Sequence, residues 1–175
     1  LRPSADAPVL GDPNAPVTVI EVADIRCPGC KEFFDKVEPK LKTNYIEKGI
    51  AKFYFWDVIP DGESKKASTA TMCAYEQGKY WEYRDDLLEN EASPGAGPTF
   101  TLSTEEYITK SGELGLDADK FRECLKSDKY SDYLLKRDQQ ARALNVDIFP
   151  TTFVNETFRL NGDISYPAVG TLIEK

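Results

Sequence analysis

The order of hydrophobic and polar residues predicts a strand, a helix and a second strand in the N-terminal third of the chain. Val17–Ala23 is almost continuously apolar and rich in β-branched residues, a pattern typical of a buried strand. Beyond Pro28, apolar residues recur every three or four positions, which indicates an amphipathic helix. These residues are Phe33, Phe34, Val37, Leu41 and Tyr45. We expect Pro39 to interrupt this helix and Gly49 to end it.

A second apolar run, residues 53–59, is rich in aromatic and β-branched side chains and predicts another buried strand. A strand, a helix and a strand in this order predict a βαβ unit with parallel strands. Towards the C-terminus, Thr151–Val154 and residues 157–160 predict a hairpin across residues 155–156. Tyr166–Ile173 predicts a final helix. The pattern therefore indicates an α/β protein.

Between the second strand and the hairpin, residues 63–146 are expected to be wholly helical. The boundaries rest on glycines, on a Gly/Pro-rich stretch and on acidic or hydroxyl residues that cap helices. In chain order we expect the end of a helix near Gly78, a helix from Tyr80, a loop at residues 93–98, a capping box at residues 103–106, a short helix from Asp117 and a long helix from Asp128 towards Leu144.

The composition excludes several classes of function. The formal net charge is −8, and acidic chains are poor partners for nucleic acids, which attract clustered Lys and Arg. The 175 residues include no histidine, which excludes Ser–His and Cys–His catalytic pairs and histidine-ligated metal sites. Hydrophobic residues make up 41% and charged residues 30%, values typical of a soluble globular protein.

The chain carries signs of export. No stretch approaches the roughly 20 apolar residues that a membrane-spanning helix needs. The sequence begins at Leu1 rather than Met, so we expect that a signal peptide or membrane anchor has been removed. An even number of cysteines, four, favours an oxidising, extracytoplasmic compartment.

Cys27 and Cys30 form a C-x-x-C sequence at the predicted start of a helix. The unpaired N–H groups and the positive end of the helix dipole favour a thiolate at the first cysteine. We therefore assign Cys27 as the nucleophile and Cys30 as the thiol that resolves a mixed disulfide. Arg26 and Lys31 flank the pair, and we expect them to add positive potential there, although a charge that is exposed to solvent acts weakly.

Two other interpretations of the cysteines remain open at this stage. A zinc site would need a second close pair of cysteines or histidines, and this chain offers only the isolated Cys73 and Cys124, so we expect no metal. Cys73 and Cys124 are either two buried thiols or a disulfide. The even count and the expected export favour the disulfide, which would add roughly 4 kcal/mol of stability.

Three segments resemble the DsbA-like thiol–disulfide oxidoreductases, a family with a thioredoxin fold. They are residues 17–30 with an acid six positions before the first cysteine, residues 73–83, and residues 150–155. The likeness extends over residues 11–175. It implies a single DsbA-like domain, with a thioredoxin core at residues 10–60 and 147–175 and a helical insert at residues 61–146. Similar cysteines in some relatives form a second, structural disulfide, and the resemblance thus implies that Cys73 and Cys124 are bonded.

The resemblance also implies roles for residues around the cysteines. Pro150 resembles the family's cis-proline beside the disulfide; the alternative is an ordinary proline at a strand start. Glu21 resembles a buried acid that handles the proton of the resolving cysteine; the alternative is a surface glutamate. We expect the substrate to bind at a set of residues near the disulfide and this proline: Pro28, Gly29, Phe149, Pro150 and Thr151.

Two positions depart from the commoner family pattern. Many strongly oxidising members have histidine between the cysteines, where this chain has Pro28 and Gly29, so we expect a weaker oxidant. Phe149 stands where a small β-branched residue is more usual. It either shapes the substrate groove or simply packs in the core.

The sequence as a whole predicts a disulfide oxidase of exported, cysteine-containing proteins. Such an enzyme needs no cofactor, but it needs a membrane redox partner to be reoxidised. The first alternative is a disulfide reductase or isomerase, because direction depends on reduction potential and partner rather than on the motif. The second is a redox-inert binding module in which Cys27–Cys30 is only a structural bridge.

Overall fold

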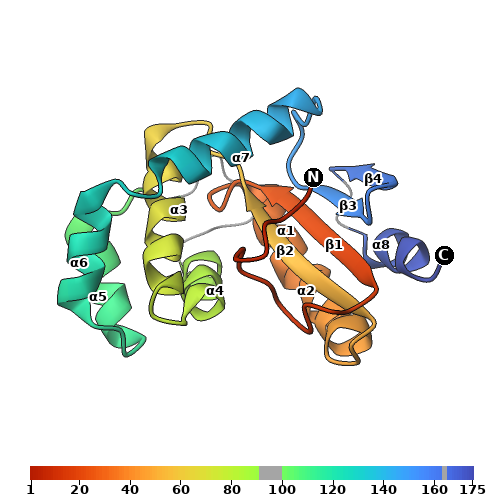
Figure 1. Cartoon of the computed structure of the whole chain (residues 1–175), viewed down its shortest axis with the longest axis horizontal. Coiled ribbons are helices and arrows are strands. Elements are labelled where there is room, and N and C mark those ends of the chain that lie inside the picture. Colours follow the sequence, from red (N-terminus) through yellow and green to blue (C-terminus); the bar gives the residue numbers. More distant parts are fainter. Residues whose placement is uncertain (91–99, 163–164) are drawn as a thin grey trace.

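Four strands form one mixed sheet in the order β2-β1-β3-β4 (Figure 1). Strand β1 (Val17–Ala23) pairs in parallel with β2 (Ala51–Asp57) and antiparallel with β3 (Thr151–Val154). Strand β4 (Phe158–Asn161) completes the edge. The central strand β1 ends directly before the C-x-x-C sequence, so the sheet places Cys27 at the carboxyl end of its central strand.

The computed structural model describes residues 1–90, 100–162 and 165–175. The loop expected at residues 93–98 lies outside these ranges. Within them, no helix combines the length and the apolar character that crossing a membrane requires.

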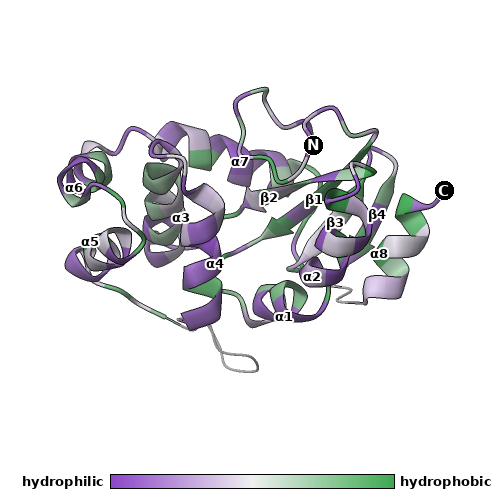
Figure 2. Ribbon diagram, turned by 90° about the horizontal axis from the view of Figure 1, so that it is seen from below, coloured by the Kyte–Doolittle hydropathy of each residue, from purple (hydrophilic) through white to green (hydrophobic). Residues whose placement is uncertain are grey.

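Alternate residues of β1 point to opposite faces of the sheet, and helices cover both faces. On one face, Val19 and Ala23 pack in the main hydrophobic core with residues of helices α1 (Pro28–Lys36), α3 (Gly62–Tyr75), α4 (Tyr80–Asn90) and α8 (Tyr166–Ile173). On the other face, Ile20 and Val22 pack against helix α7 (Ser131–Ala143), which crosses the sheet (Figures 1 and 2). The sheet is therefore buried on both sides, which explains why β1 is so continuously apolar.

Helices fill the chain between the strands, as expected. The helix after the first strand is divided into α1 (Pro28–Lys36), α2 (Glu38–Leu41) and a π-helical turn η1 (Lys42–Ile46), with Pro39 in the first turn of α2. The remaining helices are α3 (Gly62–Tyr75), α4 (Tyr80–Asn90), α5 (Thr104–Glu113), α6 (Ala118–Ser127), α7 (Ser131–Ala143) and α8 (Tyr166–Ile173). Helices α5 and α6 lie farthest from the sheet (Figure 1).

Three sequence-based boundaries were wrong. Asp128 does not begin α7 but ends α6 in the left-handed conformation, with φ of 51°, and α7 starts at Ser131. The hairpin turn has one more residue than expected, because β3 and β4 pair at Val154 and Phe158. Asn155 adopts a φ of 53° there and bonds through its backbone and side chain to Thr18. Strand β2 begins and ends two residues earlier than expected.

Candidate active site

Cys27 and Cys30 are joined by a disulfide at the N-terminus of α1, with their Cα atoms 5.3 Å apart. Cys27 is the N-cap residue, and its Sγ accepts a hydrogen bond from the backbone N–H of Cys30 at 3.1 Å. Pro28 follows as the first helical residue, where a missing N–H leaves no bond unmade. Cys27 is half-buried, whereas Cys30 is only 1% exposed. Cys27 is therefore the sulfur that a second thiol can reach.

The charged residues that flank the pair are buried rather than exposed to solvent. Arg26 and Lys31 are 5% and 8% exposed. Arg26 donates from Nε to the Phe100 carbonyl at 2.7 Å and from Nη1 to Asp61 at 2.9 Å. The active-site loop is thereby attached to the start of α3, and the charge of Arg26 is neutralised within the protein.

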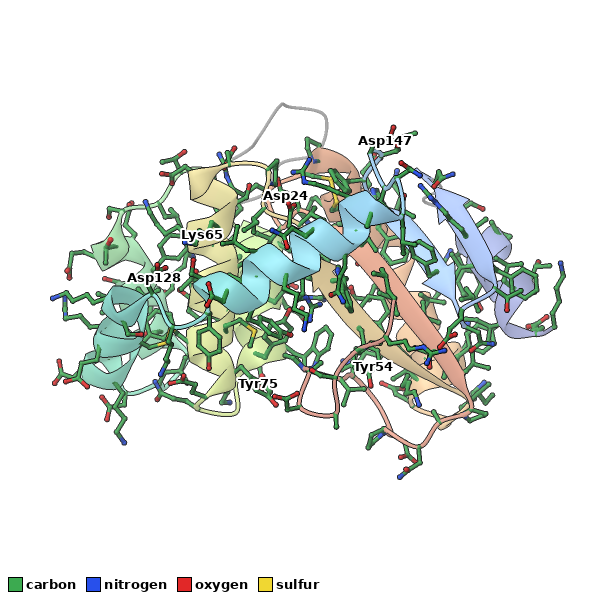
Figure 3. The ribbon with its side chains drawn as sticks, turned by 45° about the horizontal axis from the view of Figure 1, so that its top comes forward. Asp24, Tyr54, Lys65, Tyr75, Asp128 and Asp147 are labelled. Atoms are coloured by element: carbon green, nitrogen blue, oxygen red, sulfur yellow. A yellow bond between two sulfur atoms is a disulfide. The ribbon has the colours of Figure 1, made fainter. Side chains whose placement is uncertain are left out.

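Asp24 completes this attachment from the end of β1. Its carboxylate accepts hydrogen bonds from the Arg26 N–H at 3.0 Å and from the Ser64 hydroxyl at 2.9 Å (Figure 3). Burial raises the pKa of Asp24 above its usual range. Sequence analysis missed Asp24; its signal was an acid placed between a buried strand and the cysteines.

Gly29 lies directly against the loop that enters β3. A Cβ atom built on Gly29 would be 3.1 Å from the Phe149 carbonyl oxygen and 3.2 Å from Cδ of Pro150. The Phe149–Pro150 peptide bond is cis, and Thr151, the next residue, is fully buried at the start of β3. The fold thus brings Pro28, Gly29, Phe149, Pro150 and Thr151 to one place beside the disulfide.

Apolar surface continues beyond this loop. Ile148 is 51% exposed and Leu144 is 41% exposed, and both precede the half-buried Phe149 in sequence. Phe149 packs against both hydrophobic cores, so core packing accounts for part of this side chain. The connection that contains Ile148 begins where α7 ends, and Figure 3 labels Asp147 of this connection near the end of α7.

Glu21 is buried in the middle of β1, with 1% of its surface exposed, so it is not a surface glutamate. Its neighbours in the sheet are Phe55 and Thr152. Burial raises the pKa of Glu21 well above its usual range, the nearby Glu38 carboxyl raises it further, and the Arg84 guanidinium lowers it. Glu21 is therefore a carboxyl that favours its protonated form.

Arg84 and Glu38 are charged residues of the core that sequence analysis missed. Arg84 is fully buried and donates from Nη2 to Glu38 at 2.5 Å. Its guanidinium carbon lies 4.8 Å from the ring centre of Trp81. The signal in the sequence was spacing, because Arg84 falls at a buried position in the stripe formed by Tyr80, Tyr83 and Leu87.

Cys73 and Cys124 are joined by a second disulfide, which connects α3 to α6. Their Cα atoms are 5.7 Å apart, and 51 positions separate them in sequence. Both residues are buried, at 1% and 3% exposure. This bond lies within the helical region, apart from the residues gathered around Cys27.

Comparison with known proteins gives consistent matches. A family model described as thioredoxin matches residues 4–175. The disulfide bond formation protein D of Bacillus subtilis is 28% identical over 178 residues, which cover 96% of this chain and 76% of the relative. The probable disulfide bond formation protein D of Bacillus cereus is 30% identical over 157 residues, which cover 83% of this chain and 68% of the relative.

Solved structures give the same result. The crystal structure of oxidised BdbD from Bacillus subtilis superimposes with a TM-score of 0.85 and 26% identity, covering 97% of this chain and 91% of BdbD. The alpha-DsbA1 of Wolbachia pipientis has the same fold, with a TM-score of 0.82 and 21% identity over 99% of this chain and 92% of its own. The mixed sheet and the helices between β2 and β3 thus have counterparts in solved proteins.

Proposed function

We propose that this chain, which belongs to the thioredoxin family and is a DsbA-like thiol–disulfide oxidoreductase, oxidises pairs of cysteines in exported proteins. The observation that supports this proposal is the position of the Cys27–Cys30 disulfide, which caps a helix and contacts the loop of Pro150 through Gly29. A purely structural bridge has no need for a helix N-terminus, which stabilises a thiolate at the capping cysteine. This argues against the redox-inert binding module.

The reaction proceeds in two exchange steps. A substrate thiolate attacks Sγ of Cys27, the Cys27–Cys30 bond breaks, and its electron pair leaves on Sγ of Cys30, which takes up a proton. A second substrate thiolate then attacks the substrate sulfur of the mixed disulfide, and Cys27 leaves as a thiolate stabilised by α1. The substrate gains a disulfide and the enzyme is left with two reduced cysteines.

We assign the residues around the disulfide to substrate binding and proton transfer. An extended peptide lies along the half-buried Gly29 beside Cys27, next to the loop of the buried Pro150, and the exposed Ile148 of that loop offers further apolar contact. Phe149 supplies apolar contact at the same place. Glu21, which favours its protonated form, is the proton donor for Cys30.

The direction of the reaction depends on the reduction potential. Pro28 and Gly29 add no charge beside Cys27, and the charge of Arg26 is paired with Asp61, so we expect a weaker oxidant than relatives with histidine between the cysteines. A reductase or isomerase remains the second candidate. The names of the disulfide bond formation proteins among the relatives favour the oxidase.

The remaining features of the proposal concern its setting. The protein acts outside the cytosol on cysteine-containing exported proteins, and a membrane redox partner reoxidises it, as the two disulfides and the relatives suggest. The chain forms one DsbA-like domain, with a thioredoxin core at residues 10–60 and 147–175. The helical insert at residues 61–146 holds the active-site loop through Asp61.

Trapping with a Cys30→Ser variant tests the proposal. The variant cannot resolve mixed disulfides. After its Cys27 thiol is converted to a mixed disulfide with Ellman's reagent, it is expected to accumulate adducts through Cys27 with reduced, unfolded substrate proteins, with release of thionitrobenzoate, seen by non-reducing electrophoresis. A Cys27→Ser variant is the control and forms none. Absence of adducts with Cys30→Ser would refute an exchange enzyme. A redox titration of the wild type then separates the oxidase from the reductase.

A further inference from the structure

Three buried charged side chains interact on the sheet face that packs against Cys30. They are Glu21 of β1, Glu38 of α2 and Arg84 of α4, with 1%, 5% and 0% of their surfaces exposed. Arg84 is bonded to Glu38 at 2.5 Å and to Asp85 at 2.6 Å. Both Glu38 and Arg84 act electrostatically on Glu21. Two buried carboxyls thus lie near one buried guanidinium. Because the charge of each carboxylate disfavours ionisation of the other, the pair retains a proton to a higher pH than a single carboxyl beside Arg84 would.

The atoms of this cluster are not fully bonded to one another. Glu21 Oε1, Glu38 Oε2 and Arg84 Nη1 are buried and have no hydrogen-bond partner within the described ranges of the chain. The same holds for the Thr152 hydroxyl, directly opposite Glu21 in the sheet. Buried polar atoms nearly always have partners, and internal water is the usual one where side chains supply none. The unpaired atoms therefore mark places where water can bridge Glu21 and Glu38.

Glu38 is buried but borders a cavity that opens at the protein surface. A surface cavity with a volume of about 300 Å³ lies between α1, α2 and α4. Its lining consists of Phe34, Asp35, Glu38, Pro39, Lys42, Asp85 and Glu89. The break between α1 and α2 places Glu38 as the first residue of α2, where the residue borders this cavity and its side chain contacts Arg84. Neither Cys27 nor any residue of the Pro150 loop lines it.

We propose that Glu38, held by Arg84, is the solvent end of a proton path to Glu21, and that the proton given to Cys30 is replaced through this cavity. This inference rests on the proposed function. When substrate attacks Cys27, Cys30 receives the electron pair of the broken S–S bond and a proton from the Glu21 carboxyl. Glu21, now a carboxylate, takes a proton that comes from solvent by way of Glu38.

A separate entrance has a functional reason. While the mixed disulfide exists, the substrate is bonded to Cys27 and occupies the surface beside Gly29 and Pro150. Water therefore reaches Glu21 poorly from that side. The cavity at Glu38 opens elsewhere and stays accessible. Arg84 is a positioning residue in this scheme, since a guanidinium keeps its proton and acts by holding the Glu38 carboxylate.

A Glu38→Gln variant tests the path, with Asp85→Asn as the matched control. Asp85 contacts the same guanidinium and lines the same cavity, but its side chain is 38% exposed and it is not among the groups that shift the pKa of Glu21. The measurement is the rate at which a thiol peptide opens the Cys27–Cys30 disulfide, taken as the ratio of variant to wild type from acid to alkaline pH. The ratio cancels the ionisation of the peptide itself.

We expect Glu38→Gln to lower this ratio about tenfold at neutral pH, and more at higher pH. The Glu38 carboxyl, on which Asp85 and Lys42 act, raises the pKa of Glu21, and the Arg84 guanidinium lowers it. Removing the Glu38 charge while Arg84 stays in place therefore lowers the pKa of Glu21, so that Glu21 loses the proton that it donates at a lower pH. Asp85→Asn should stay within about twofold of the wild type, since exposed charges act weakly. A purely structural defect would lower the ratio equally at every pH. A flat ratio would therefore overturn the path while leaving exchange by Cys27 intact.

A second measurement does not depend on the Glu38 variant being folded. The Cys30→Ser protein, with Cys27 activated by Ellman's reagent, is converted by the thiol peptide to the mixed disulfide with release of thionitrobenzoate and is then moved into D₂O. The infrared band of the Glu21 carboxyl is followed and is assigned by its loss in Glu21→Gln. We expect deuterium to reach Glu21 as fast as in the peptide-free protein. If deuterium reached Glu21 only after the peptide is released, the cavity would not be the entrance of the proton path. Failure of the peptide to form the adduct at all would instead refute the proposed function.

Discussion

The two disulfides of this protein have the same chemistry and opposite surroundings. Cys27–Cys30 spans three positions at the N-terminus of α1, and Cys27 is half-buried. Cys73–Cys124 spans 51 positions, and both cysteines lie in the last turn of their helices, α3 and α6, fully within the core. A helix N-terminus favours a thiolate, whereas the C-terminal turn and burial disfavour one. The comparison indicates that helix position and exposure, rather than the bond itself, separate a reactive disulfide from an inert one.

Their effects on stability differ in the same way. A bridge over three positions closes a very short loop and restricts the unfolded chain little, whereas one over 51 positions restricts it strongly. The region around Cys27 also contains groups that oppose folding, notably the buried Glu21 and its unpaired oxygen. The helical region thus raises the free energy of unfolding, whereas the buried groups of the active-site region lower it.

The sharpest test of this contrast is the reactivity of the two bonds in the folded protein. A dithiol reductant is expected to open Cys27–Cys30 at least about 100-fold faster than Cys73–Cys124, because attack needs an accessible sulfur and a stable leaving thiolate. Alkylation followed by mass spectrometry identifies which cysteines are reduced over time. Unfolding in denaturant should remove the difference. Equal rates in the folded protein would contradict the contrast.

Removing the long-range bond should affect stability and leave exchange unchanged. We expect a Cys73→Ala/Cys124→Ala variant to lose about 4 kcal/mol of unfolding free energy, the chain-entropy estimate for a loop of this length. Guanidinium unfolding measures the loss, and the rate of exchange through Cys27 under conditions where the variant stays folded is the control. A large fall in that rate would mean that Cys73–Cys124 takes part in the reaction.

The sequence predicted the elements around Cys27 well because their signals are local. The apolar run of β1, the C-x-x-C sequence at a helix start and the interruption near Pro39 depend on neighbouring residues. Packing between distant segments was not predictable in this way. Glu38 and Arg84 are separated by 46 positions, and each lies among charged residues that suggest a solvated surface.

Sequence-based predictions were wrong where a side chain has a different role from the one that its residue type suggests. Asp128 has the composition of a helix start, but the chain turns there in the left-handed conformation, which aspartate tolerates. Asn155 lengthened the hairpin turn because its side chain and backbone bond to Thr18 in another strand. Arg26 was expected to add positive potential beside the cysteines, but its charge is paired with Asp61. Its burial depends on Asp61 and Phe100, which only the fold brings close.

The rate of exchange at Cys27–Cys30 should also depend on the close backbone contact at Gly29. A glycine of the helical region that makes no such contact should not affect this rate. Gly29→Ala places a methyl group 3.1 Å from the Phe149 carbonyl oxygen, so the Pro150 loop has to shift by a few tenths of an ångström. We expect exchange with a peptide to slow about tenfold, given the sensitivity of such reactions to small misplacements. Gly112→Ala in α5 is the control, since nothing lies within 4 Å of its added Cβ. Peptide oxidation rates measure both, and unchanged exchange in Gly29→Ala would contradict the tight contact.

The smallest expected effect concerns the free energy of unfolding, which ionisation of the buried Glu21 lowers. Burial raises the pKa of Glu21 in the folded protein. Below the ordinary glutamate pKa both folded and unfolded chains are protonated, and Glu21 adds no pH dependence. As the pH rises through the folded-state pKa, the unfolded chain has already ionised and stability is lost. We expect Glu21→Gln to remove this loss, about 1.4 kcal/mol for each pKa unit of elevation, and to match the wild type in acid. Urea unfolding across pH measures it, with the exposed Glu47→Gln as the control; a difference from wild type that did not grow with pH would show that Glu21 is not a buried, protonated acid.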